Sequence, residues 1–184
     1  MARSAMSTSK VFTSLAMVAA AAMALAACTP VAPAQRLGLG TTPTAEQVRA
    51  WDIDVRADGT GLPAGSGTVA RGQALYESRC LACHGAKGEK GIAPRLAGGQ
   101  GTLATKAPVL TVGSYWPYAP TLFDYIRRAM PPDSPQSLTA DEVYAVTAYT
   151  LHLNGIVGAD AVLDATSLAA IKMPNRDGFR AVVK

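Results

Sequence analysis

The sequence predicts an all-α domain of small helices, with extended segments at its N- and C-terminal ends. Three stretches carry apolar residues at helical spacing, and the last of them opens with a complete capping sequence. The length of 184 residues favours one domain, or at most two small ones. Hydrophobic residues make up 49% of the chain and charged residues 16%, which argues against a disordered protein.

Residues 1–27 have the features of a lipoprotein-type secretory signal peptide. Arg3 and Lys10 are its only charges, and an alanine-rich apolar run follows from Val11 to Ala27. That run is short for a membrane span and consists mostly of small residues. The segment therefore predicts an exported, periplasmic protein.

Cys28 directly follows this segment, and the string Leu25-Ala26-Ala27-Cys28 resembles the lipobox at which bacterial lipoproteins are lipidated. A lipid on Cys28 would anchor the chain to a membrane. The alternative is cleavage after Ala26, which leaves Cys28 as a free thiol and a liability in an oxidising compartment. Lipidation is the favoured interpretation.

Residues 28–43 are rich in proline, glycine and threonine, which indicates a flexible tether ahead of a domain over residues 44–180. The domain includes a C-terminal extension from about residue 155. Removal of residues 1–27 takes away two basic residues and no acidic one, so the formal net charge falls from +4 to +2. No run of lysine or arginine suggests a nucleic-acid partner.

The first helical stretch leads directly into a haem attachment motif. Its repeating positions lie at spacings of 3, 4, 4 and 3, on one face of a helix: Val69, Gly72, Tyr76, Cys80 and Cys83. Residues 80–84 form a CxxCH motif, in which two thiols add to the haem vinyl groups and the adjacent histidine, His84, lies under the iron. The sequence therefore predicts one covalently bound haem c.

Two other interpretations of the motif fit the sequence less well. A thioredoxin-like CxxC needs a strand before it and a helix that opens at the first cysteine, whereas here the helical pattern precedes the motif. A tetrahedral zinc site needs a second pair of cysteine or histidine ligands, which the chain does not offer.

The haem iron of an electron carrier often has a methionine ligand opposite the histidine. Met130 is the favoured sixth ligand, because it follows an apolar helical pattern over 122–129 and Pro131 ends that helix, which gives a rigid proline loop. Met173 is the runner-up, with packing against the domain as its alternative role. His152, inside a helical pattern, and an open sixth site remain as further possibilities.

The proximal histidine needs a hydrogen-bond acceptor for its second ring nitrogen, because that bond fixes the tautomer and the orientation of the ring. The carbonyl of Pro94, ten residues after His84, is the candidate acceptor. The alternative is that Pro94 only shapes a loop. Gly85, Gly88 and Gly91 fit a loop that lies close to a flat macrocycle, since glycine permits close backbone approach.

The last strong helix begins with a capping box, in which Thr139 is the N-cap and Glu142 is at N3, and Asn154-Gly155 stops it. We expect this helix to pack across the helix that precedes the haem. Tyr144 and Tyr149 on it are assigned to core packing, with haem contact as the alternative.

Tyr115 and Trp116 belong to an aromatic cluster in a chain with only 6% aromatic residues. They are candidates for the haem environment, where they would donate to the propionates and cover the haem edge, and the alternative is core packing. Arg127 and Arg128 have three candidate roles, namely pairing with propionates, docking a partner and forming a solvated helix end.

The order of helix, CxxCH, Gly/Pro loop, helix, Met-Pro loop and capped helix resembles the class I cytochromes c. Several strings resemble one subfamily more closely, the SoxD-like cytochrome subunit of the sulfane dehydrogenase of the bacterial thiosulfate-oxidising (Sox) system, over about residues 44–180. These strings are Trp51–Arg56, Gly61–Pro63, Thr111–Tyr118, Phe123–Pro131 and Met173–Phe179. Within them, SYWPY and MPNRDGF are the most specific.

The resemblance implies a class I cytochrome c fold in which Cys80 and Cys83 hold the haem and His84 and Met130 bind its iron. It also implies a molybdopterin-containing sulfur dehydrogenase subunit as electron donor and a soluble cytochrome c as acceptor. Some family members carry a second haem domain, whereas this chain has one CxxCH. A related sulfite dehydrogenase cytochrome or a membrane-anchored variant is the alternative within the family.

The chain is expected to be an electron-transfer subunit that is not an enzyme on its own, since its sequence shows no Ser-His-Asp set, phosphate loop or second metal cluster. Two other hypotheses compete with this one. The first is a free-standing, lipid-anchored carrier for a terminal oxidase. The second is a haem enzyme with an open or displaceable sixth ligand.

Overall fold

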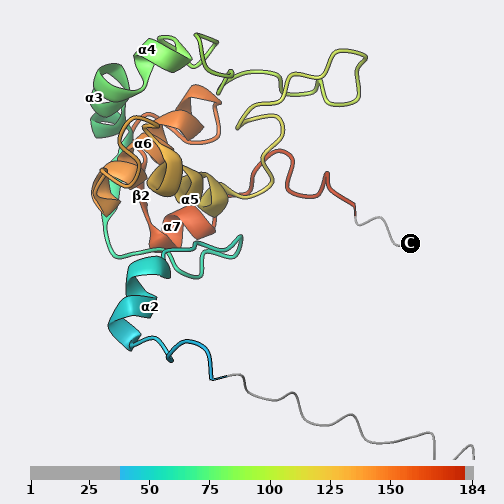
Figure 1. The fold of residues 1–184 in the computed structure, drawn as a ribbon. Coiled ribbons are helices and arrows are strands. Elements are labelled where there is room, and N and C mark those ends of the chain that lie inside the picture. Colours follow the sequence, from blue (N-terminus) through green and yellow to red (C-terminus); the bar gives the residue numbers. More distant parts are fainter. Residues whose placement is uncertain (1–37, 181–184) are drawn as a thin grey trace, which may run out of the picture. The chain divides into compact units, whose positions relative to one another are not determined.

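The computed structural model describes residues 38–180. The chain divides into two units, residues 1–44 and 45–184, and the elements described below all belong to the second (Figure 1). The segment predicted as a signal peptide, Cys28 and most of the predicted tether lie outside the described residues. Over residues 38–180, no helix is both long and apolar enough to span a membrane.

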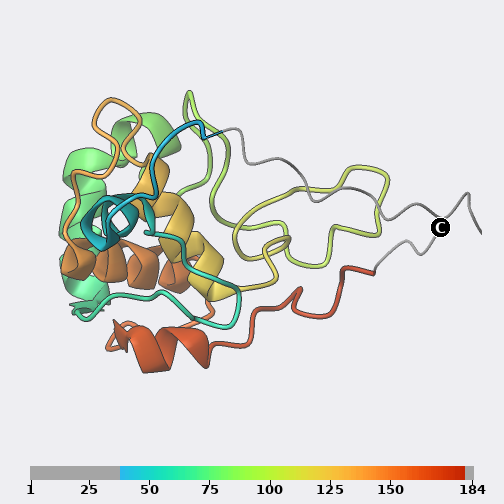
Figure 2. The ribbon, with the colours of Figure 1, turned by 60° about the horizontal axis from the view of Figure 1, so that its bottom comes forward.

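The predicted all-α fold is confirmed, and a helix is found in each of the three stretches with helical spacing. In chain order the elements are α2 (Ala45–Trp51), β1 (Ser66–Thr68), α3 (Val69–Arg79), α4 (Leu81–His84), α5 (Ala119–Ala129), α6 (Ala140–Leu153), β2 (Val162–Asp164) and α7 (Ala165–Ala169). The long loop between α4 and α5 reaches away from the helices (Figures 1 and 2).

The strands β1 and β2 form an antiparallel ladder that the sequence analysis missed. Ser66 pairs with Asp164, and Thr68 pairs with Val162. Each strand has only three residues, which is too short to show the alternation that identifies a strand. Because the ladder joins the chain just before α3 to the chain after α6, the C-terminal extension is part of the packed domain.

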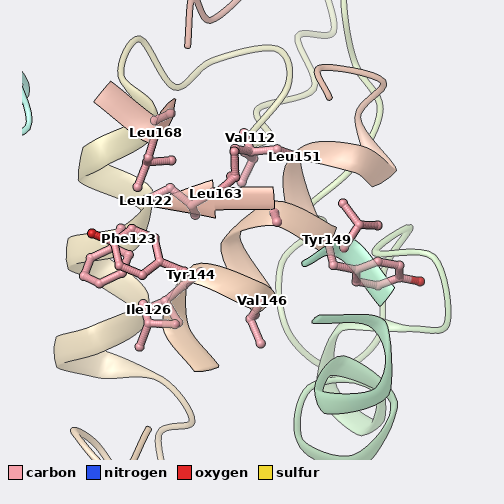
Figure 3. Packing of buried hydrophobic residues seen from close by; sticks show 14 of the residues in the cluster. Val112, Leu122, Phe123, Ile126, Tyr144, Val146, Tyr149, Leu151, Leu163 and Leu168 are labelled. Atoms are coloured by element: carbon pink, nitrogen blue, oxygen red, sulfur yellow. The ribbon is translucent and has the colours of Figure 1, made fainter. Parts of the chain in front are cut away.

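The core lies mainly between α5 and α6 (Figure 3). The rings of Phe123 on α5 and Tyr144 on α6 lie 4.5 Å apart, and the Tyr144 hydroxyl donates to the carbonyl of Pro63 at 2.8 Å. Further along α6, the ring of Tyr149 lies 5.2 Å from that of Tyr76 on α3. Both tyrosines of α6 therefore pack in the core, and the Tyr144 hydroxyl already has a backbone partner.

The helices α3 and α6 cross closely, as the sequence analysis expected. Gly72 of α3 is buried against the backbone of Ala145, and a Cβ atom at Gly72 would clash with the Ala145 carbonyl oxygen. Gly67 of β1 likewise lies against the Ala145 backbone. Two glycines thus allow the first half of the domain to approach α6 at backbone distance.

The capping box at the start of α6 is formed as predicted. The Thr139 hydroxyl accepts from the Glu142 backbone N–H at 3.4 Å, and the Glu142 carboxylate accepts from the Thr139 N–H at 2.8 Å. The Glu142 carboxylate accepts from both the backbone N–H and the hydroxyl of Thr139, and these bonds to the charged form hold the pKa of Glu142 below its ordinary value.

We expect Thr139→Ala to lower the free energy of unfolding by about 1 kcal/mol, because the first turn of α6 loses its side-chain acceptor. Guanidinium denaturation of the haem-loaded protein at neutral pH measures this change. Ser137→Ala, two residues before the cap, is the matched control and should have a smaller effect. Equal losses in the two variants would contradict the capping role.

Candidate haem site

A cavity of about 470 Å³ brings together the residues of the CxxCH motif and Met130. This volume is within the range of cofactor sites in proteins. Much of the lining is apolar and comes from α5, α6 and the long loops that follow α4 and α5, as Leu96, Val112, Leu122, Ile126, Leu138 and Val146 show. The cavity thus offers an apolar enclosure with sulfur and nitrogen donors at its wall.

One wall of the cavity is formed by the CxxCH motif, whose residues lie on a single helical turn. Cys80 ends α3, and its N–H donates to the carbonyl of Tyr76 at 2.9 Å. The turn α4 follows, in which the N–H groups of Cys83 and His84 donate to the Cys80 carbonyl at 3.1 and 3.0 Å. Residues three and four apart share one helical face, so both thiols and the imidazole line the same cavity.

No disulfide joins the two motif cysteines. Burial raises the pKa of Cys80 to about 11. The thiol of Cys80 is therefore neutral at pH 7 before it is linked to another group.

The His84 ring is oriented by a backbone carbonyl. Its Nδ1 atom lies 3.1 Å from the carbonyl oxygen of Pro94, the acceptor that the sequence suggested. Donation to this carbonyl needs a proton on Nδ1, which leaves the free lone pair of an iron ligand on Nε2.

The glycine-containing loop after α4 is held against the motif by backbone contacts. Gly85 ends α4 with a φ of +81°, and its carbonyl accepts from the Tyr76 hydroxyl at 2.8 Å. A Cβ atom at Gly91 would clash with the carbonyl of Cys83, to which Ala93 donates at 2.9 Å. Gly91 thus allows the loop backbone to lie directly against the backbone of the CxxCH motif.

The three candidates for the sixth ligand lie in different environments. Met130 is the C-cap of α5, is partly buried and lines the cavity. Met173 is only 1% exposed but belongs to the hydrophobic core and is not among the residues that line the cavity. His152 lies on α6 with Nδ1 3.1 Å from the carbonyl of Val157, also outside the lining.

The aromatic residues of the loop before α5 divide between two places. Trp116 lines the cavity, together with Tyr125 of α5. Tyr115, which the sequence analysis also expected beside the haem, lies outside the lining and packs against Phe179, with the ring centroids 5.1 Å apart. Adjacent side chains outside a helix point in different directions, so only one of the pair faces the cavity.

Arg127 and Arg128, for which the sequence left three roles open, lie in the last turn of α5. Arg128 bridges Asp124 and Asp54, and Arg127 donates to the carbonyl of Ile53 at 3.3 Å, so both secure the segment after α2 to α5. Neither lines the cavity.

Arg79 and Arg95 line the cavity instead, and the sequence analysis missed both. Arginine side chains at such a wall match the carboxylates of haem propionates. Their positions in the sequence could have identified them, because Arg79 directly precedes Cys80 and Arg95 directly follows Pro94.

This combination of fold and donor set defines a c-type cytochrome. Two thiols, an imidazole with its Nδ1 already bonded and a thioether meet at one largely apolar cavity, which fits a covalently bound haem.

Comparisons with known proteins agree. The family model for cytochrome c matches residues 69–154, and the chain belongs to this family. A chain in the crystal structure of the sulfane dehydrogenase SoxCD from Paracoccus pantotrophus is 46% identical, with a TM-score of 0.75. That match covers 79% of this chain and 72% of the other. Comparison with curated protein sequences gave no significant match.

The resemblance to class I cytochromes c and to the cytochrome subunit of the Sox sulfane dehydrogenase is therefore confirmed, and so is haem c as the cofactor.

Proposed function

We propose that this chain is the electron-transfer subunit of a molybdenum-containing dehydrogenase for sulfur compounds. It accepts electrons from the molybdopterin subunit and passes them to a soluble cytochrome c in the periplasm. The observation that carries this proposal is the presence of His84 and Met130 in the wall of one cavity with Cys80 and Cys83.

The four residues have separate roles in this proposal. Cys80 and Cys83 would hold the haem covalently, and His84, oriented by Pro94, would bind its iron. Met130, which lines the same cavity at the end of α5 and immediately precedes the buried Pro131, would be the second iron ligand. When bound, the haem supplies reversible one-electron transfer between ferric and ferrous iron.

Ligation of the iron by both His84 and Met130 would explain why the chain transfers electrons without chemistry of its own. An iron bound by two protein side chains has no open position for a substrate. Neutral imidazole and thioether ligands in an apolar lining favour ferrous iron over the more highly charged ferric state. The sulfur substrate would therefore be oxidised at the partner.

The identity of the partner rests on the match to a SoxCD chain at 46% identity over 79% of this chain. Residues 1–27 and Cys28 support export and anchoring to a membrane by a lipid, with residues 28–43 as the tether. These segments would hold the cytochrome at the membrane surface while the domain meets soluble partners.

Mixing experiments test the proposed electron path. We expect the ferric haem of the full-length protein to be reduced when the purified molybdenum subunit of a sulfane dehydrogenase and its sulfur substrate are both present. The absorbance of the reduced haem follows the reaction. The matched controls omit either the subunit or the substrate and should show no reduction.

Other outcomes of the same experiment would favour other functions. Reduction by the sulfur substrate alone would contradict the proposal and indicate a haem enzyme. No reduction with both components, together with rapid oxidation of the ferrous protein by a terminal oxidase, would indicate a free-standing carrier.

A further inference from the structure

The two most specific strings of the sequence contact each other in the structure. We name residues 173–179 the C-terminal strap and residues 114–118 the SYWPY loop. The Asn175 side-chain amide donates to the backbone carbonyl of Tyr115 at 2.7 Å. The ring of Phe179 meets the Tyr115 ring edge-on at 5.1 Å, and the Arg176 guanidinium lies 4.5 Å above the Tyr118 ring.

The strap begins at a fixed point of the domain. Met173 is buried in the hydrophobic core, and the Arg176 N–H donates to its carbonyl at 3.1 Å. Gly178 packs so tightly that a Cβ atom there would clash with the Asn175 side-chain oxygen. The strap therefore extends from the core to the loop with a defined shape.

Trp116 lies between the two tyrosines that the strap contacts. Its own side chain lines the cavity, and its ring meets that of Tyr125 edge-on at 5.8 Å. Tyr125 belongs to α5, the helix that ends at Met130, and also lines the cavity. Trp116 is the one residue of the SYWPY loop that lines the cavity, and the strap contacts residues on both sides of it, Tyr115 and Tyr118.

The start of the loop is fixed independently of the strap. The Ser114 hydroxyl donates to the carbonyl of Val109 at 2.6 Å, and the Tyr115 N–H donates to the carbonyl of Thr111 at 3.0 Å. The Asn175 side-chain amide donates to the Tyr115 carbonyl, which directly precedes Trp116 in the chain. This bond is the last polar contact ahead of the tryptophan.

We propose that Asn175 is a positioning residue, and that the C-terminal strap holds Trp116 in the wall of the haem cavity so that water is excluded from the cavity. This inference rests on the proposed placement of the haem in the cavity. Exclusion of water favours the less charged ferrous state, so the strap raises the reduction potential of the haem.

The accessibility of Trp116 in the full-length haem-loaded protein provides the direct test. A tryptophan-selective oxidant modifies exposed indole rings, and peptide mass spectrometry gives the rate at each of the two tryptophans of the chain. Trp51, which is 86% exposed, is the internal reference. In Asn175→Ala we expect Trp116 to be oxidised several-fold faster relative to Trp51.

The reduction potential is the second readout. We expect Asn175→Ala to lower it by about 30 mV, which is about a threefold shift in the equilibrium between ferric and ferrous forms. Gly178→Ala should change both readouts in the same direction, because the added methyl displaces the Asn175 side chain. A retained band for methionine sulfur on ferric iron shows that the variants are folded and correctly ligated.

Asp177→Asn is the matched control, since Asp177 is an exposed residue of the same strap. It should leave Trp116 protected, and the loss of a negative charge can only raise the potential. Unchanged Trp116 oxidation and potential in both Asn175→Ala and Gly178→Ala would overturn the proposal. A wild-type protein without the methionine band would instead contradict the proposed ligation, so the two failures are distinguishable.

Discussion

Replacing Met130 by alanine should abolish the charge-transfer band of methionine sulfur on ferric iron and lower the reduction potential of the haem. Met130 is the C-cap of α5 and lines the cavity. Met173, the other methionine of the described residues, is buried in the core and does not line the cavity. Loss of the thioether removes a ligand that favours ferrous iron. We expect a fall of more than about 59 mV, a tenfold change in the ferric–ferrous equilibrium.

Met173→Ala is the control for this variant. It should keep the band and lose stability instead, by about 2–5 kcal/mol, because a side chain that is 1% exposed leaves a cavity in the core. Absorption spectroscopy and guanidinium denaturation of both variants separate the two effects. Loss of the band in Met173→Ala, with retention in Met130→Ala, would reverse the assignment.

Replacing Gly72 by alanine should destabilise the domain by about 3 kcal/mol or more, at the upper end of the range for overpacked cores. The new methyl group would clash with the carbonyl oxygen of Ala145. A backbone carbonyl, unlike a side chain, cannot change rotamer to relieve the clash, so α3 and α6 must move apart. The intrinsic gain of alanine over glycine within a helix, about 0.5–1 kcal/mol, is too small to offset this.

Ala74→Val on the same helix gives the matched comparison. Ala74 is exposed, so the added methyl groups meet solvent, and the cost should be limited to the lower helix propensity of valine, below about 0.7 kcal/mol. Free energies of unfolding from guanidinium titration measure both changes. Similar values for the two variants would show that the helices can separate without loss.

The sequence predicted the elements that carry long periodic patterns. The helices α3, α5 and α6 have 11, 11 and 14 residues, enough for an apolar face to be recognised. The helices α2 and α7 have seven and five residues, and β1 and β2 have three each. Elements of this length are too short for an apolar face to repeat, so hydrophobic spacing does not identify them.

The site was predictable where chemistry depends on local spacing. The CxxCH motif sets the positions of Cys80, Cys83 and His84 within one helical turn. The wall contributed by the long loop after α4 depends instead on the path of some thirty residues without regular structure. Arg95 was therefore missed, and Tyr115, expected beside the haem, lies outside the cavity lining and packs against Phe179.

The ladder between β1 and β2 has a consequence for where this cytochrome module ends. The cytochrome c family pattern stops at residue 154, yet Leu163 of β2, Leu168 of α7 and Met173 are all buried in the same core. A fragment trimmed to the pattern would expose the apolar surface that these three side chains cover. A fusion protein that contains this domain must therefore include the chain as far as the C-terminal strap.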